Sequence, residues 1–162
     1  MKLIGSIIVM GTMISACATF GTADDRWADY RSWTKITEGR VSTEDRTGFV
    51  GTVHAGPTGY RDIFVNKIAL ATNQGTAPYN YPVGSVLVKE QFKDKATWEA
   101  QGSREVTIMV KVATSAKPNA DNWAFAAGLT ASAEKNPFCS GCHTAALKDD
   151  FVFTNEDFFK AQ

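Results

Sequence analysis

The chain has 162 residues, of which 44% are hydrophobic, and its 17 basic and 17 acidic side chains give a formal charge of zero. This length and composition are those of one globular domain with a core of its own. They exclude disordered, collagen-like and coiled-coil chains. The balanced charge and the lack of a Lys/Arg run argue against a nucleic-acid partner.

Residues 1–18 have the layout of a secretory signal. A basic residue precedes the apolar run 3–14, and no acidic residue occurs before Asp24. The run spans about 12 residues, whereas a helix that crosses a bilayer needs about 20, so the pattern indicates a signal rather than a transmembrane anchor. The sequence therefore predicts export to the periplasm and a single mature domain over residues 19–162.

Two outcomes are open at the end of this signal. The string Ile14-Ser15-Ala16-Cys17 resembles a bacterial lipobox, in which the cysteine is acylated and becomes the first mature residue. Cys17 would then be a lipid anchor to the outer membrane. The alternative is ordinary cleavage after Ala18, because Ala16-Cys17-Ala18 also has the small-x-small pattern of a cleavage site. Cys17 would in that case be discarded with the signal.

The start of the mature chain predicts a short helix followed by turns. Acidic residues followed by aromatic side chains at near-helical spacing predict one short helix over residues 24–34. Residues 38–59 are rich in Gly, Thr and Ser, which predicts turns with one strand near 49–53.

The rest of the chain is dominated by strand signals. Four β-branched or aromatic runs are bounded by Gly, Pro or Asn, and each predicts a strand. These runs are residues 60–66, 85–90, 105–113 and 123–129. The charged segment 91–102 is expected to be a helical or irregular crossover, and residues 154–159 a capped short helix. The predicted fold is α+β and mainly β, an antiparallel sheet with a few peripheral helices.

One motif near the C-terminus carries chemistry, Cys139-Ser140-Gly141-Cys142-His143. Two thiols at this separation can each form a thioether to one of the two haem vinyl groups, and the adjacent imidazole can then reach the iron. The motif predicts one covalently bound haem c, with Cys139 and Cys142 as attachment points and His143 as the iron ligand. Thioether attachment takes place outside the cytoplasm, in agreement with the predicted signal.

Three other uses of the same cysteines are less favoured. A zinc site would need two further ligands, and His54 is the one other histidine. A redox-active dithiol usually lies early in the chain and does not require the histidine. A structural pair of thiols in an exported protein would tend to oxidise to a disulfide.

The second axial position of the iron has two candidates in the mature chain. His54 lies in a Gly-rich stretch where a histidine is more often a surface residue, and Met109 is the one methionine outside the signal. Strand alternation places Met109 on the same face as Glu105, Thr107 and Lys111, where a large apolar side chain either fills space against an aromatic residue or lies in the haem pocket. Either residue could be the sixth ligand of an electron-transfer cytochrome.

Beyond this motif, the sequence resembles the cytochrome P-460 and cytochrome c′-beta proteins, whose haem motif also lies near the C-terminus of a mainly β domain. Matching stretches occur in the family's order over nearly the whole mature chain. They are Tyr30-Arg31-Ser32-Trp33, Tyr60-Arg61-Asp62-Ile63-Phe64-Val65-Asn66, Gly84-Ser85-Val86-Leu87-Val88-Lys89-Glu90, Asn122-Trp123-Ala124-Phe125 and Phe151-Val152-Phe153. The resemblance implies a homodimer, a five-coordinate iron and chemistry on small nitrogen oxides.

The resemblance also implies roles for three pocket residues. Lys89 matches the lysine that P-460 members join covalently to a meso carbon of the haem, and burial would lower its pKa and free its amine for nucleophilic attack. Arg61 matches an arginine beside the distal pocket, where a fixed cation could orient a polar ligand. Thr107 stands where the family has a glutamate that relays protons in hydroxylamine oxidation, and threonine cannot accept a proton near neutral pH.

Three functions follow as expectations. The first is an exported mono-haem cytochrome that binds nitric oxide or related nitrogen oxides at an open iron site. The second is a P-460 type oxidoreductase that oxidises hydroxylamine with Lys89 joined to the haem; Lys89 favours it and Thr107 counts against it. The third is an electron carrier with Met109 or His54 as sixth ligand. The sequence identifies no redox partner protein.

Overall fold

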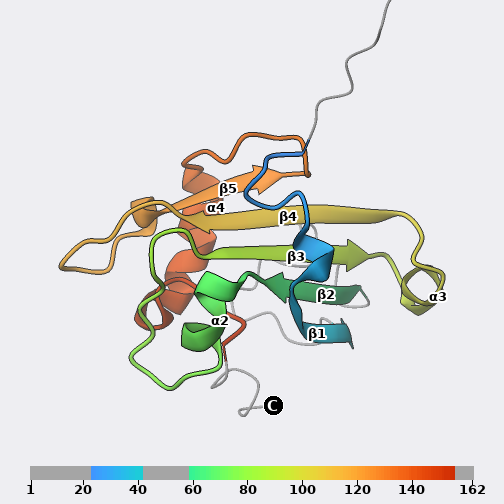
Figure 1. Ribbon diagram of the computed structural model, residues 1–162, viewed down its shortest axis with the longest axis horizontal. Helices are drawn as coiled ribbons and strands as arrows, with labels where there is room; N and C mark the ends of the chain where they lie inside the picture. The colour runs from blue at the N-terminus through green and yellow to red at the C-terminus, as the bar shows by residue number, and fades with distance from the viewer. Residues whose placement is uncertain (1–22, 42–58, 156–162) are drawn as a thin grey trace, which may run out of the picture.

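The structure is a computed structural model, and it describes residues 23–41 and 59–155. Its centre is one antiparallel sheet of five strands in the order β1-β2-β3-β4-β5 (Figure 1). The strands are β1 (Thr34–Val41), β2 (Tyr60–Val65), β3 (Val86–Phe92), β4 (Arg104–Lys111) and β5 (Trp123–Ala127). Short helices lie around the sheet, so the α+β, mainly β fold class is confirmed.

The helices are short and several begin at side-chain caps. They are η1 (Tyr30–Ser32), α2 (Lys67–Asn73), α3 (Lys95–Glu99), η2 (Ala120–Asn122), α4 (Pro137–His143) and η3 (Thr144–Asp149). The Asn66 side chain accepts a hydrogen bond from the Ala69 N–H at the start of α2, and Asp94 accepts one from Thr97 at the start of α3. No helix in the described ranges has the length and apolar character needed to cross a membrane.

Four strands match the expected ones, with ends that differ by a few residues, and the crossover contains α3. The helix predicted over residues 24–34 is wrong. That segment holds turns and the three-residue η1, followed by β1, because Trp27 and Tyr30 are buried against the sheet rather than lined along a helix. The strand expected near 49–53 lies outside the described residues. So does the C-terminal helix expected from residue 154, apart from its first two residues, which form a bend.

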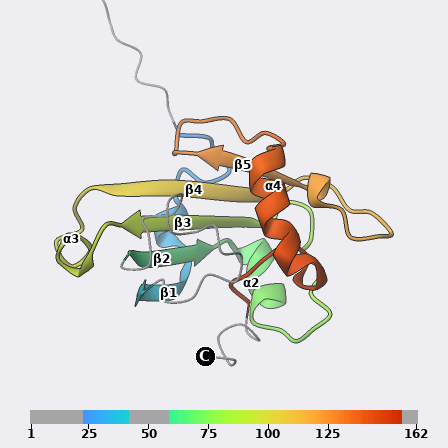
Figure 2. The same cartoon turned by 180° about the vertical axis from the view of Figure 1, so that it is seen from behind.

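The two faces of the sheet carry separate cores. On one face, Val86, Val88 and Ile108 pack against Trp27 and Tyr30, and η1 lies over this side (Figure 1). The other face, here called the α4 face, carries the alternate side chains of the same strands, among them Leu87 and Met109. Figure 2 shows α4 crossing β5, β4 and β3 on the α4 face, toward the end at which β4 finishes. The C-terminal motif is thus placed against the sheet.

Candidate functional site

Helix α4 presents the three motif residues on one side. Pro137 occupies its first turn, and the Asn136 side chain accepts hydrogen bonds from the N–H groups of Phe138 at 3.0 Å and Cys139 at 3.1 Å. Residues three and four positions apart lie on the same side of a helix, so Cys139, Cys142 and His143 project together. Both cysteines are free, partly buried thiols. Burial raises the pKa of the Cys139 thiol, so the thiol is not activated as a nucleophile.

The imidazole of His143 is held in one orientation. Its Nδ1 lies 2.7 Å from the carbonyl oxygen of Phe151, and its ring packs between Phe125 and Phe153, with ring centroids 5.3 and 5.2 Å away. A carbonyl can only accept, so Nδ1 carries the proton and Nε2 keeps a lone pair. Burial lowers the pKa of His143 to about 4, and the ring is therefore neutral at neutral pH. A neutral imidazole with Nδ1–H fixed by a carbonyl is the form that binds a metal through Nε2.

The carbonyl that fixes His143 belongs to a constrained turn. Asp150 and Phe151 follow one another with φ of +51° and +67°, a left-handed conformation that non-glycine residues rarely adopt. The carboxylate of Asp150 is bound at 2.6 and 2.8 Å by the ammonium group of Lys111 and at 2.8 Å by the N–H of Tyr81. Lys111 comes from β4, so this ion pair ties the turn after η3 to the sheet.

Polar side chains occupy the α4 face further along β3. In the strand register, Ile63 and Thr107 flank Lys89, and Arg61 and Glu105 flank Gln91. Lys89 is partly buried; loss of solvent around its ammonium group and then repulsion by Arg61 lower its pKa to about 7. Lys89 also interacts electrostatically with both thiols of the motif. The sheet therefore faces α4 with an amine that is largely neutral at slightly alkaline pH.

The other predicted site residues are distributed as follows. Met109 lies on the α4 face, 8% exposed, in register with Leu87 on one side and Phe125 on the other. Thr107 is the direct neighbour of Lys89, and Arg61 is partly buried on the same face. His54 and Cys17 lie outside the described residues.

Sequence reasoning missed several participants. The sequence pattern places Gln91 in the crossover because a charged segment follows it, although alternation from Lys89 puts it on the same face of β3. The role of Asp150 depends on a turn with two successive positive φ angles, which no hydrophobic pattern reveals. Phe125 and Phe153 stand in stretches that match the family, but no local pattern predicts their role, because their contacts with His143 join segments that are distant along the chain.

The residues present fit a haem. The site offers two thiols, a neutral imidazole with a bare Nε2, and apolar side chains from the sheet and the C-terminal segment. In the described ranges, no group of three or more His, Cys, Asp and Glu side chains could hold a metal ion directly. One imidazole and two thiols beside an apolar face suit iron that is already bound in a porphyrin, with the imidazole as ligand and the thiols as attachment points.

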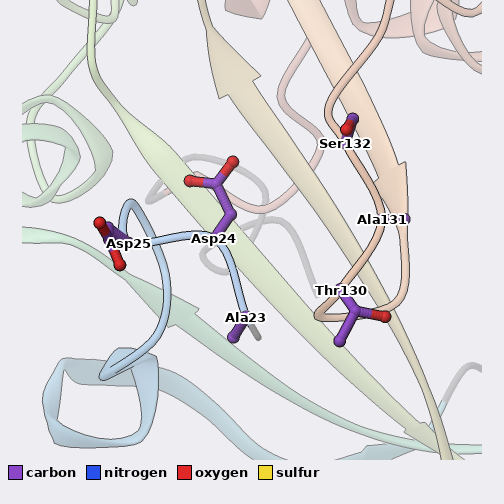
Figure 3. A pocket seen from close by; sticks show the side chains of 6 residues that line it. All are labelled: Ala23, Asp24, Asp25, Thr130, Ala131 and Ser132. Atoms are coloured by element: carbon purple, nitrogen blue, oxygen red, sulfur yellow. The ribbon is translucent and has the colours of Figure 1, made fainter. Parts of the chain in front are cut away.

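A hollow lies elsewhere on the surface, between the N-terminal segment and the loop after β5 (Figure 3). It is lined by Ala23, Asp24, Asp25, Thr130, Ala131 and Ser132. The Asp24 carboxylate is paired with Arg26 at 2.7 Å, which lowers its pKa to about 2. The hollow is separate from the α4 face, because Leu129 and Ala131 of the same loop pack against the core around Trp27 on the other side of the sheet.

Comparison with known proteins supports the same assignment. The profile of the family described as Cytochrome P460 matches residues 27–154, which span every described strand and α4. No curated protein matches the sequence significantly. The profile covers far more than half of the chain, and the protein therefore belongs to the cytochrome P460 family of haem proteins, of the P460 and c′-beta kind.

Proposed function

We propose that this protein is an exported cytochrome with one covalently attached haem c that binds nitric oxide or related small nitrogen oxides at an open coordination position of its iron. The observation that carries the proposal is the state of His143, a neutral imidazole with its Nδ1 proton given to Phe151 and its Nε2 free to ligate. Cys139 and Cys142 on the same side of α4 would hold the haem.

The other residues of the site would control the surroundings of the iron. Phe125 and Phe153 flank His143 and limit the access of water to the imidazole. Met109 packs between Leu87 and Phe125 in the apolar core, which favours a space-filling role over ligation. When bound, haem supplies an iron centre that coordinates small diatomic ligands. Arg61 provides a cation on the face where such a ligand would lie.

The ferrous absorption spectrum tests this proposal. We expect a high-spin ferrous spectrum that changes when nitric oxide is added, and no change of that spectrum in Met109→Leu. A low-spin spectrum that nitric oxide leaves unchanged would refute an open site and support the electron-carrier alternative. Mass spectrometry of haem peptides should find haem on the peptide containing Cys139 and Cys142, and the double variant Cys139→Ala/Cys142→Ala should not retain it.

A second candidate is hydroxylamine oxidation with Lys89 joined covalently to the haem. The observation that favours it is the lowered pKa of Lys89, about 7, together with its electrostatic coupling to the thiols that would carry the haem. The neighbour of Lys89 in β4 is Thr107, which supplies no proton acceptor, and Glu105 lies opposite Gln91 instead. A Lys89 peptide that carries haem would support this candidate, and one free of haem would exclude it.

Export, anchoring and assembly complete the proposal. The predicted signal over residues 1–18 would direct the protein to the periplasm, and lipidation of Cys17 would fix it to the outer membrane. The mass of the mature N-terminus distinguishes an acylated Cys17 from cleavage after Ala18. The homodimer implied by the family is tested by light scattering of the haem protein.

A further inference from the structure

Gln91 is buried on the α4 face without a hydrogen-bond partner. Its side chain is 1% exposed, and neither its Nε2 nor its Oε1 bonds to any group in residues 23–41 and 59–155. Burial of an amide that makes no hydrogen bond is unfavourable, and native proteins seldom leave both atoms of one unsatisfied. The two amide atoms therefore point to a partner that is not part of the described chain.

The neighbouring residue shows how this fold ordinarily treats a buried polar side chain. Glu90 is also 1% exposed, but its side chain lies on the opposite face and its Oε1 is bound by Arg31 at 2.6 Å and by Arg104 at 2.9 Å. The Tyr30 hydroxyl donates to the same oxygen. Gln91 lacks such partners although it occupies the same strand. The two residues differ in the face of the sheet on which the side chain lies, and Gln91 lies on the α4 face.

The strand register places Gln91 on the same face as the candidate haem site. It lies two residues from Lys89 on the same side of β3, about 7 Å along the strand. Lys89 in turn interacts electrostatically with both thiols and with His143. The direct neighbours of Gln91 are Arg61 in β2 and Glu105 in β4. The unpartnered amide thus lies in the polar half of the face against which the haem would be held.

We propose that the side-chain amide of Gln91 hydrogen-bonds to the polar end of the small ligand held at the haem. This inference rests on the proposed function and names a residue that would set the affinity of that same site. A glutamine amide donates through its NH₂ group and accepts through its carbonyl oxygen, so it can bond to the oxygen of a nitrogen oxide. A carboxylate of the haem is the other possible acceptor, but Arg61, charged and only partly buried, suits that group better than a fully enclosed neutral amide.

The test is the vibrational spectrum of the ferrous nitric oxide complex. A hydrogen bond to the ligand oxygen weakens the N–O bond, so Gln91→Leu should raise the N–O stretching frequency. The wild-type frequency should change in D₂O, and that of the variant should not. Loss of one hydrogen bond of ordinary strength should also speed nitric oxide release about five- to tenfold.

Two further variants make the result interpretable. Gln74→Leu makes the same chemical change at an exposed position at the end of α2 and should alter none of these values. Gln91→Met keeps the length of the side chain without its amide, and replaces Gln91→Leu if that protein does not assemble.

The outcomes separate the inference from the proposed function. If nitric oxide does not bind to the wild-type protein, the proposed function fails and the inference falls with it. If nitric oxide binds but Gln91→Leu leaves the N–O frequency and its D₂O shift unchanged, the inference alone is overturned. An unchanged frequency with an altered reduction potential would show that Gln91 bonds to a haem carboxylate instead.

Discussion

At the scale of single residues, the chemistry of His143 depends on an ion pair that does not touch it. The Phe151 carbonyl reaches His143 because Asp150 and Phe151 hold a left-handed turn, and Lys111 and Tyr81 fix the Asp150 carboxylate. The side chains of Lys111 and Asp150 are 4% and 11% exposed. Removing one member of a buried pair is far more costly than the pair's net contribution, because the other charge stays buried without compensation.

Replacing Asp150 should therefore affect both stability and the iron. Asn tolerates the left-handed conformation and has the shape of Asp, so Asp150→Asn removes the charge alone. We expect a loss of about 3 kcal/mol in the free energy of unfolding, measured by urea denaturation, since Lys111 is left unpaired. We also expect a change in reduction potential, because the carbonyl that orients His143 loses its anchor.

The exposed pair Lys95–Glu99, 3.5 Å apart on α3, provides the matched control. Glu99→Gln should cost less than about 0.5 kcal/mol, as solvent-exposed helix pairs do. If Asp150→Asn were no more destabilising than Glu99→Gln, the turn would not depend on the buried ion pair.

Lys89 should make the stability of the haem-free chain depend on pH. Its pKa is about 7 when folded and near 10.5 when unfolded, so between these values the unfolded chain binds more protons and stability rises with pH. From pH 7 to pH 9 the rise should be roughly 2 kcal/mol, because half of the folded amines are still protonated at pH 7. Urea unfolding of Lys89→Met should lack this increment, and an equal pH dependence in both proteins would contradict the proposed burial of the amine.

At the scale of elements, the sequence predicts those strands whose alternation is unbroken. Strands β2 to β5 pair in continuous register, whereas β1 pairs with β2 through two register shifts, between Lys35 and Thr37 and between Thr37 and Arg40. Each shift interrupts the period of two on which a strand prediction depends. The segment therefore gives a turn-like pattern although it forms the edge of the sheet.

Local sequence patterns likewise predict only part of the candidate site. The attachment residues Cys139, Cys142 and His143 follow from local spacing, and the common face of Leu87 and Lys89 follows from alternation. The contacts of His143 with Phe125 and with the Phe151 carbonyl join segments that are distant along the chain or depend on backbone torsions. No local pattern carries that information.

Strand β1 contains a glycine whose replacement should be costly. Gly39 has φ of +59°, and a Cβ at this position would lie 2.5 Å from the Trp98 ring. That ring is held in place because its Nε1 donates to Asp62 at 2.9 Å, and Asp62 also accepts from the Gly39 N–H at 2.7 Å. We expect Gly39→Ala to lower the free energy of unfolding by about 1–3 kcal/mol, measured by urea denaturation.

A second glycine shows the opposite case. A Cβ at Gly141 would meet no atom within 4 Å, and the residue lies inside α4. Gly141→Ala should leave stability unchanged or raise it by up to about 1 kcal/mol, since alanine favours the helix. Similar losses of stability in Gly39→Ala and Gly141→Ala would show that the close approach of Trp98 does not cause the loss in Gly39→Ala.

At the scale of the whole molecule, the two faces of the sheet differ in how they are completed. The face opposite α4 is closed by the chain itself, with Trp27 and Val88 each 0% exposed. On the α4 face, none of the seven residues of α4 is fully buried, although this helix carries the motif. A helix of this length has little stability of its own, so the order of α4 depends on its contacts and on the haem it would carry.

Haem attachment should therefore slow hydrogen exchange more in the α4 region than in the central strands of the sheet. In hydrogen exchange followed by mass spectrometry at early times, where local opening dominates, haem should slow exchange of amides in residues 139–152 at least about tenfold. The comparison is between the haem protein and the Cys139→Ala/Cys142→Ala variant. Amides of Val88 and Ile108 in the central strands should change much less, because neighbouring strands already hold them. A uniform change along the chain would instead mean that haem stabilises the molecule as one unit and that α4 is not its weakest part.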